Sequence, residues 1–412
     1  MNALSLSVLS AVCQPPVFID RQCRSANPLW DEHILLGLLR FTECAFITGW
    51  RGSDFDPECL AVKRQQRATL QAVAQRAGVS PATASRAMAG AAIVHPDTIR
   101  RVRAAAESLG YLPGGPAQAL ASGRTHTIGA IIPTLDHSIF ARAIQALQTT
   151  LARNGYQLLI AAHEYSAVEE AVLVRSMLGR GVDALMLVGA DHLPATWALV
   201  TEAPIPVVLT WSFDDRLDSI GFDNAQAGYL AARHLLAKGH CRFGMVSGFT
   251  QANDRARLRI DGVRRALAAE GIEFSNARVS QQPFSLAGGR AGLLQLLGLA
   301  EPPTAVVCGN DLLAVGVLLE AKQRGLTIPR DLSVVGIDNL EIASHIAPSL
   351  TTIHLPTAEL GREVAEHLLA RLRGESRARR TEMPIELIER RSSGPLLMPT
   401  GQPFAGHRHG VK

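Results

Sequence analysis

Residues 68–90 read ATLQAVAQRAGVSPATASRAMAG, and this stretch determines how the N-terminal part of the chain folds. Thr69 is a good N-cap for a helix whose apolar side chains recur at spacings of three and four. Gly78 ends that helix, because glycine tolerates the left-handed conformation that a sharp turn needs. Ser80 then caps a second helix, and Pro81 occupies its first position, where the missing N–H costs nothing. Two short helices joined by a tight glycine turn predict a helix-turn-helix.

A third helix is predicted after this pair, with His95 as its cap, Pro96 at its start and Gly110 at its end. Small polar side chains and one guanidinium are expected on the outward face of the second helix. Hydroxyl groups can reach phosphates, and a guanidinium can contact the O6/N7 edge of guanine with two hydrogen bonds. The alternative is an ordinary helical hairpin with a solvated arginine. The residues of the outward face are Ala82, Thr83, Ser85 and Arg86.

The distribution of charge favours the nucleic-acid interpretation. The whole chain has a formal net charge of only +4. Residues 1–62 hold 4 basic and 7 acidic side chains, residues 63–126 hold 9 and 2, and residues 127–412 hold 28 of each. A short segment at +7 joined to a neutral body predicts a module that binds a polyanion.

From Thr127 onward, strand-like apolar runs alternate with helical stretches. Such alternation predicts an α/β fold whose parallel sheets are covered by helices on both faces. The runs form two sets of about equal length, which indicates two similar lobes, and segments near 351–357 and 385–393 are expected to cross between them. The predicted strands are TIGAIIP, YQLLIAA, ALMLVGA, IPVVLT, SIGFDN, FGMVSG, AVVCGN and SVVGID. The predicted helices cover about 138–154, 166–180, 226–238, 254–270, 286–297, 311–324 and 357–374.

Polar and aromatic side chains follow the predicted strands. Ligands in such folds lie at the carboxyl ends of the strands, here in a cleft between the lobes. Arg259 comes from the start of the helix that follows one strand, and Phe284 comes from a loop. An ordinary helix N-cap remains an alternative for Asn310, Asp311 and Asp338, and Trp211 could be a buried anchor. The candidate ligand-binding residues are Asp136, Phe140, Trp211, Arg259, Phe284, Asn310, Asp311 and Asp338.

Three runs carry a resemblance to a known family: TLQAVAQRAGVSPATASRAMAG, VHPDTIRRVRAAAESLGYLP and AQALASGRTHTIGAIIP. Together they resemble the lactose-repressor (LacI/GalR-type) family of bacterial transcription regulators, over about residues 68–395. The resemblance implies a three-helix DNA-binding head on a two-lobed core like that of periplasmic binding proteins. It implies that Arg86 reads a base, that Tyr111 braces the head and that Leu120 wedges into the minor groove. The DNA-binding residues implied or predicted are Thr69, Ser80, Pro81, Ala82, Thr83, Ser85, Arg86, Tyr111 and Leu120.

The sequence departs from the family pattern in the head and in the hinge. Ala72, Ala84 and Ala89 stand where the family has Asp, Val and Asn. Gly114 replaces the usual Asn and is followed by Gly115, and two glycines weaken the start of a hinge helix. We therefore expect a hinge that becomes ordered only on DNA.

The resemblance also implies a small-molecule effector against Phe140, Arg259, Asp311 and Asp338, with an aromatic ring near Phe284. Carboxylates, amides and an arginine fit a sugar or a sugar acid. The implied partners are near-palindromic double-stranded DNA, the effector and a second copy of the chain. No membrane, metal or cofactor is expected, and the N-terminus lacks the basic residues that usually begin an export signal, which favours the cytoplasm.

A chain of 412 residues is too long for one compact core. We expect a poorly ordered extension over 1–67, a helix-turn-helix domain over 68–113 and a hinge over 114–126. After the hinge we expect a two-lobed effector-binding and dimerisation domain over 127–395 and a disordered tail over 396–412.

Three classes of function are compatible with this organisation. The first is an effector-controlled transcription regulator, expected to be a repressor, and the basic head favours it. The second is a solute-binding receptor of a transporter, which would share the core but lack the head. The third is a sugar-modifying enzyme, but the sequence has no Walker P-loop, GxSxG, HExxH or complete GxGxxG motif.

Overall fold

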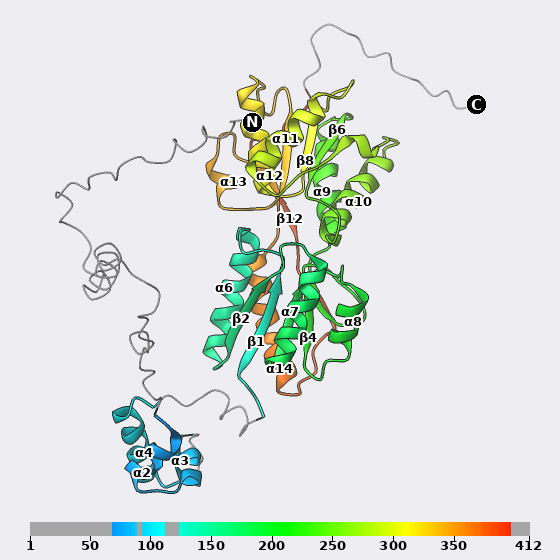
Figure 1. Ribbon diagram of the computed structural model, residues 1–412. Coiled ribbons are helices and arrows are strands. Elements are labelled where there is room, and N and C mark those ends of the chain that lie inside the picture. The colour runs from blue at the N-terminus through cyan, green and yellow to red at the C-terminus, as the bar shows by residue number, and fades with distance from the viewer. Residues whose placement is uncertain (1–67, 89–92, 112–122, 397–412) are drawn as a thin grey trace, which may run out of the picture. The chain divides into compact units, whose positions relative to one another are not determined.

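The structure is a computed structural model, and it describes residues 68–88, 93–111 and 123–396. The expectations for the extension 1–67, for Ala89, for Leu120 and the hinge start, and for the tail from 397 onward lie outside these residues. The chain divides into two compact units, with the division after Leu112. Each unit is described by itself, and Figure 1 shows the elements of both.

The first unit contains the three predicted helices, α2 (Leu70–Ala77), α3 (Pro81–Met88) and α4 (Pro96–Ser108). Each turn has the chemistry that the sequence indicated. The Thr69 hydroxyl accepts a hydrogen bond from the Ala72 N–H at 3.2 Å, and Gly78 ends α2 with φ of 64°. Small side chains build the core between the helices, which lets them pack closely; the buried ones are Val73, Ala74, Ala77, Ala84, Ala87, Val102, Ala105 and Ala106.

The second unit consists of two lobes, each built on a six-stranded sheet. The first sheet has the order β11-β5-β4-β3-β1-β2, and all of its pairings are parallel. Its central strands β1, β3 and β4 are buried apolar runs, as expected for a sheet covered on both faces, whereas the edge strands β2 and β11 are exposed or half-buried. The strands of this sheet are β1 (Thr127–Ile132), β2 (Gln157–Ala162), β3 (Ala184–Val188), β4 (Val207–Thr210), β5 (Asp218–Gly221) and β11 (Arg380–Glu382).

The second sheet has the order β12-β10-β9-β8-β6-β7, and only the edge strand β12 is antiparallel among its described pairings. Its strands are β6 (Phe243–Ser247), β7 (Val279–Gln281), β8 (Ala305–Cys308), β9 (Ser333–Asp338), β10 (Thr351–His354) and β12 (Glu386–Ile388). The two similar lobes and their parallel sheets confirm the expected fold class.

Helices cover both sheets. The first lobe has α6 (Ser138–Arg153), α7 (Ala167–Gly179), α8 (Pro194–Thr201) and α14 (Thr357–Leu372), and Figure 1 shows α14 beside α6. The second lobe has α9 (Asn224–Ala237), α10 (Asp254–Ala268), the short 3-10 helix Asn276–Arg278, α11 (Leu286–Leu297), α12 (Asp311–Gln323) and α13 (Ile342–His345). Helices α8 and α13 were not among the predicted elements.

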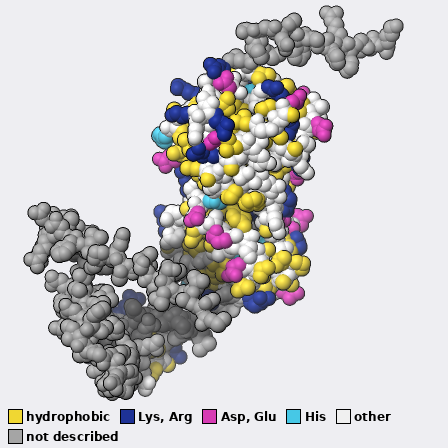
Figure 2. Space-filling view, turned by 45° about the horizontal axis from the view of Figure 1, so that its top comes forward, with side chains coloured by type: hydrophobic (Ala, Val, Ile, Leu, Met, Phe, Trp, Pro, Cys, Tyr) yellow, Lys and Arg dark blue, Asp and Glu magenta, His cyan; other side chains and the backbone are white. Residues whose placement is uncertain are grey.

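The chain passes between the lobes three times in the described residues: after β5, after β10 and after β11. The crossing after β10 lies at residues 355–356, within the expected segment 351–357, and the crossing after β11 lies at 383–385, at the start of the expected segment 385–393. Strands β10 and β12 pair with each other before and after the chain visits the first lobe. On the face shown in Figure 2, basic and acidic side chains are interspersed over this unit, consistent with the equal numbers of each over residues 127–412.

Candidate DNA-binding surface and interlobe cleft

The outward face of α3 carries the polar side chains that the sequence analysis selected. Arg86, Pro81 and Ala82 are exposed, whereas Ala84 and Ala87 are buried against α2 and α4. Among the described residues, the Arg86 guanidinium has no hydrogen bond or ion pair. A short helix with one buried face and one unpaired arginine can place that arginine in a DNA groove.

The hydroxyls of this unit already hold its backbone in place. The Ser80 Oγ accepts a hydrogen bond from the Thr83 N–H at 3.1 Å and lies 2.9 Å from the Thr83 Oγ1. Ser85 is half-buried, and Tyr111 packs half-buried against the core of the unit. Because a hydroxyl that accepts a capping bond can still donate its own hydrogen, Thr69 and Ser80 remain able to contact a phosphate.

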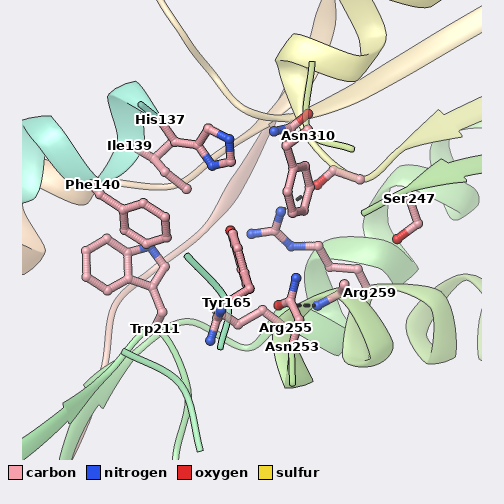
Figure 3. Close-up of a pocket in the computed structure, with 13 residues that line it drawn as sticks. His137, Ile139, Phe140, Tyr165, Trp211, Ser247, Asn253, Arg255, Arg259 and Asn310 are labelled. Carbon is pink, nitrogen blue, oxygen red and sulfur yellow. Dashed lines mark hydrogen bonds between the residues drawn. The ribbon is translucent and has the colours of Figure 1, made fainter. Parts of the chain in front are cut away.

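The second unit has a small cavity between its lobes, with a volume of about 30 Å³ (Figure 3). Aromatic side chains from the first lobe form one wall, where Phe140 and Trp211 meet edge to face with ring centroids 5.1 Å apart. Polar side chains from the second lobe form the other wall. The lining residues are His137, Ile139, Phe140, Tyr165, Trp211, Ser247, Asn253, Arg255, Ala256, Arg259, Phe284, Gly309 and Asn310.

A second cavity, of about 330 Å³, adjoins the first. The two cavities share their lining at His137, Tyr165, Asn253 and Phe284, so these side chains separate them. The Phe284 ring fits here because residue 248 is glycine: a Cβ there would lie 2.1 Å from the Phe284 Cζ. Asp136, which the sequence analysis selected, lines this outer cavity together with Thr134, Glu164, Phe249, Gln251 and Pro283.

Two cleft residues have backbone conformations that side chains rarely adopt. Trp211 has φ of 64° and Asp338 has φ of 124°. The Asn224 Nδ2 donates to the Trp211 carbonyl at 2.7 Å and holds that turn in place. The Trp211 Nε1 and the Ser247 Oγ are buried without a hydrogen-bond partner among the described residues. Strained backbone and unsatisfied polar atoms together are typical of a binding site.

Arg259 lies at the centre of the cleft and is 5% exposed. Its Nε donates to the Asn224 Oδ1 at 3.0 Å and its Nη1 donates to the Gly309 carbonyl at 2.5 Å. Its Nη1 lies 3.9 Å from the Asp338 Oδ1, so this ion pair is not a hydrogen bond.

Two aspartates lie behind the cavity wall rather than on it. Burial raises the pKa of Asp338 to about 7, and Arg259 opposes that shift. Burial, and then the charge of Asp338, raise the pKa of Asp311 well above its usual range. The Asp311 oxygens accept hydrogen bonds from the Thr352 hydroxyl at 2.5 Å and from the Leu340 N–H at 2.7 Å. Asp311 therefore supports the cleft floor, and its role in binding an effector stays a prediction.

Asn310 is both a helix cap and a residue of the cleft, so the two interpretations of it are compatible. Its Oδ1 accepts a hydrogen bond from the Leu313 N–H at 2.9 Å and caps α12, and the residue also lines the cavity. Trp211 likewise is both a buried anchor, 1% exposed, and a lining residue.

Arg255 was not among the residues predicted for the cleft, but it lines the inner cavity and is 7% exposed. The signal was present, because Arg255 precedes Arg259 by four residues and so lies on the same face of α10. Next to it, Asp254 accepts from the Ala190 N–H of the first lobe at 3.1 Å. Arg257 points away from the cavity and pairs with Asp191 of the first lobe at 2.5 Å. The start of α10 therefore joins the two lobes.

Among the described residues, no helix is long and apolar enough to cross a membrane, and no cluster of three potential metal ligands occurs.

A helix-turn-helix unit joined to a two-lobed unit with a buried polar cleft defines the class of ligand-controlled DNA-binding regulators. Residues 69–114 match the model of bacterial regulatory proteins of the lacI family, and residues 232–393 match the periplasmic binding protein-like domain. The chain belongs to the lacI family. It is a DNA-binding transcription regulator and not an enzyme, and the alternative of a solute-binding receptor is not supported.

One relative is the HTH-type transcriptional regulator GntR of Pseudomonas aeruginosa, 36% identical over 79% of this chain and 96% of that protein. Two solved structures are each 28% identical to this chain. The lac repressor dimer bound to operator and the anti-inducer ONPF is matched over 80% of this chain and all of that one, with a TM-score of 0.72. The transcriptional regulator CelR in complex with cellobiose is matched over 79% of this chain and all of that one, with a TM-score of 0.60.

Proposed function

We propose that this chain represses transcription as a cytoplasmic homodimer on a near-palindromic operator, under the control of a sugar or sugar acid bound between its lobes. The observation that carries this proposal is the combination of an exposed, unpaired Arg86 on a capped helix with a buried polar cleft in the same chain. The similarity to CelR, whose structure holds cellobiose, favours a sugar-like effector.

On the DNA, α3 would lie in the major groove with Arg86 toward a base edge. Pro81 and Ala82 would face neighbouring bases, and the hydroxyls of Thr69, Ser80, Thr83 and Ser85 would contact phosphates. Tyr111 would brace the unit against the backbone. Two copies of the unit one helical turn apart would read two half-sites, which is why we propose a dimer and a near-palindrome.

In the cleft, the effector would shift the equilibrium between arrangements of the two lobes. Trp211 and Phe140 contact it from the first lobe and Arg259, Asn310 and Phe284 from the second, so its affinity depends on how the lobes are placed. A ligand moves such an equilibrium only by its difference in affinity for the two arrangements. The preferred arrangement decides whether the effector releases the operator or promotes binding to it.

Selection of duplexes from a random pool tests the DNA-binding proposal. The chain is expected to enrich a near-palindrome and to bind it as two chains per site, measured by light scattering of the complex. Raising the salt concentration from about 50 to 200 mM should lower the affinity about 10³-fold or more, because several phosphates are neutralised at once. Enrichment of a single half-site bound by one chain would contradict the dimer.

Trp211→Phe tests the cleft. The change removes the Nε1–H but keeps most of the ring, so an effector that accepts this hydrogen bond should lose roughly 5- to 100-fold in affinity. Titration calorimetry with an effector found in a thermal-shift screen of sugars and sugar acids measures it. Trp197→Phe is the control, because Trp197 is also buried in the first lobe, at 8% exposed against 1% for Trp211, but lines neither cavity. An equal loss in both variants would count against a cleft contact.

A further inference from the structure

The inner cavity offers mainly hydrogen-bond donors, and the lining side chains that can also accept are Ser247, Tyr165 and an uncharged His137. Helix capping uses the amide oxygens of Asn253 and Asn310, which accept from the Ala256 and Leu313 N–H groups, so their NH₂ groups are the parts left for a ligand. The buried, unpartnered Trp211 Nε1 is a donor only. The two arginines that line the cavity are also donors only. Among the lining side chains that come from the second lobe, Ser247 is the one that can accept a hydrogen bond as readily as it donates one.

Arg255 adds a positive charge to the cavity wall, and the neighbouring Asp254 carboxylate offsets it. Its Nη1 donates to the Asp254 Oδ1 at 2.9 Å. That carboxylate also accepts from the Ala190 N–H of the first lobe, so it is held away from the cavity by the contact between the lobes. Burial raises the pKa of Asp254, but Arg255, Ser212 and the Ala190 N–H together lower it below its usual value. The Asp254 carboxylate is therefore ionised, and its negative charge balances the positive charge of Arg255.

The second arginine has no such fixed partner. Arg259 lies 3.9 Å from the Asp338 carboxylate, which is buried and accepts no hydrogen bond at its Oδ1 from the described residues. Because burial holds the pKa of Asp338 near 7, that carboxyl is protonated in a large fraction of molecules at neutral pH. When it is protonated, the cavity has one positive charge in excess.

The outer cavity has the opposite polarity. Its lining includes the exposed carboxylates of Asp136 and Glu164, which accept hydrogen bonds. Only His137, Tyr165, Asn253 and Phe284 separate it from the inner one. At about 30 Å³, the inner cavity has room for a small group such as a carboxylate, and at about 330 Å³ the outer cavity has room for the rest of a sugar-sized molecule.

We infer that the effector is an acidic sugar derivative whose carboxylate or phosphate enters the inner cavity, and that Arg255 is the residue that selects the acid. This inference rests on the proposed effector cleft and narrows it. The acid group accepts from the donors of the inner cavity, and the hydroxyls of the ligand donate to the carboxylates of the outer one. A neutral sugar would place a hydroxyl among donors and leave the positive charge unbalanced.

Titration calorimetry on the full chain tests the inference with matched probes. The acids are D-gluconate, D-glucuronate, D-galactonate, D-galacturonate and D-glucose 6-phosphate, and the neutral counterparts are D-glucose, D-galactose and D-glucitol. At least one acid should bind 10-fold or more tightly than its neutral counterpart. The hexose phosphate arm separates a phosphate from a carboxylate.

Arg255→Gln should weaken the binding of that acid about 10- to 150-fold, because a charge-assisted hydrogen bond is lost. Arg255→Lys should keep most of the affinity by retaining the charge. Arg264→Gln is the control, since Arg264 lies on the same helix, pairs with Asp261 and Asn276, and lines neither cavity described here. Circular dichroism of each variant establishes that it is folded.

The dependence on pH gives a second readout that does not need the Arg255 variants. The carboxylate of a sugar acid is ionised throughout pH 6 to 8.5, whereas a phosphate monoester releases its second proton near about pH 6, so this readout uses the carboxylate acids. As the pH rises through about 7, Asp338 ionises and neutralises Arg259, so the affinity for the acid should fall, by no more than about tenfold per pH unit for one linked proton. Burial lowers the pKa of both His137 and His163 below that of an exposed histidine, which moves their titration away from that of Asp338. The ionisable groups around Asp338 are Arg259, Asp311, Tyr165, His354 and Arg390.

Asp338→Asn imitates the protonated carboxyl, and asparagine tolerates the positive φ of this position. This variant should keep its affinity for the acid and lose the dependence on pH. The inference is overturned if a neutral sugar binds as tightly as its acid, or if affinity rises with pH, and in both cases the effector cleft itself stands. If no acid and no neutral sugar binds, the inference and the proposed sugar-controlled cleft fall together.

Discussion

Arg86→Ala is expected to lower the affinity for the selected operator about 5- to 150-fold while leaving the affinity for unrelated duplexes nearly unchanged. The reason is that a guanidinium bonded to a base edge contributes about 1–3 kcal/mol of discrimination, whereas phosphate contacts act equally on every sequence. In the free protein the Arg86 side chain is exposed and has no partner among the described residues, so its removal should not disturb the packing of α3. Fluorescence anisotropy with both duplexes at one salt concentration measures the two affinities.

Arg103→Ala serves as the matched control for this change. Arg103 is an exposed arginine of the same unit, but it lies on α4 rather than on α3. Its removal should alter both affinities by the same small factor. If Arg86→Ala also reduces both affinities equally, Arg86 contacts only phosphate and α3 is not the element that reads the bases.

Gly262→Ala should unfold the second unit at a markedly lower temperature. Helices α9 and α10 cross at Gly228 and Gly262, where their backbones touch. A Cβ on residue 262 would lie 1.9 Å from the Ala225 carbonyl oxygen, and backbone atoms cannot move aside as a side chain can. Overpacking of this kind costs about 1–3 kcal/mol or more, which corresponds to a decrease in Tm of roughly 2–12 °C for a unit of this size.

The same change should weaken effector binding, because Arg259 comes from α10 and is held by Asn224 at the start of α9. Gly179→Ala is the control. Gly179 ends α7, a Cβ there would meet nothing within 4 Å, and alanine favours a helix, so Tm should stay constant or rise slightly. Differential scanning calorimetry compares the two variants. A Tm for Gly262→Ala equal to that of Gly179→Ala would show that the helix crossing can relax.

Several elements could be predicted to within a residue or two, because their signals are local. Helix α11 covers the predicted residues 286–297, and the caps at Thr69, Ser80 and His95 are those that the sequence indicated. Helix α8 was missed because it is a short, mostly apolar segment that begins at a proline between two buried strands and has little periodicity of its own.

The candidate cleft was predictable only in outline. Strand ends indicated Phe140, Trp211 and Asn310, and all three line the inner cavity. Asp136 lines the outer cavity instead, and Asp311 and Asp338 lie behind the wall. The position of a residue after its strand does not reveal whether another side chain lies between that residue and the cavity.

The sequence by itself determined the helix-turn-helix, the two α/β lobes and the family of the chain, because caps, glycine turns and apolar periodicity act over a few residues. Only the tertiary structure decided that Arg255 lies in the cavity, that capping leaves amide NH₂ groups to face a ligand, and that acceptors lie in the outer cavity. These properties depend on segments more than a hundred residues apart in the chain, which packing brings within a few ångströms of one another.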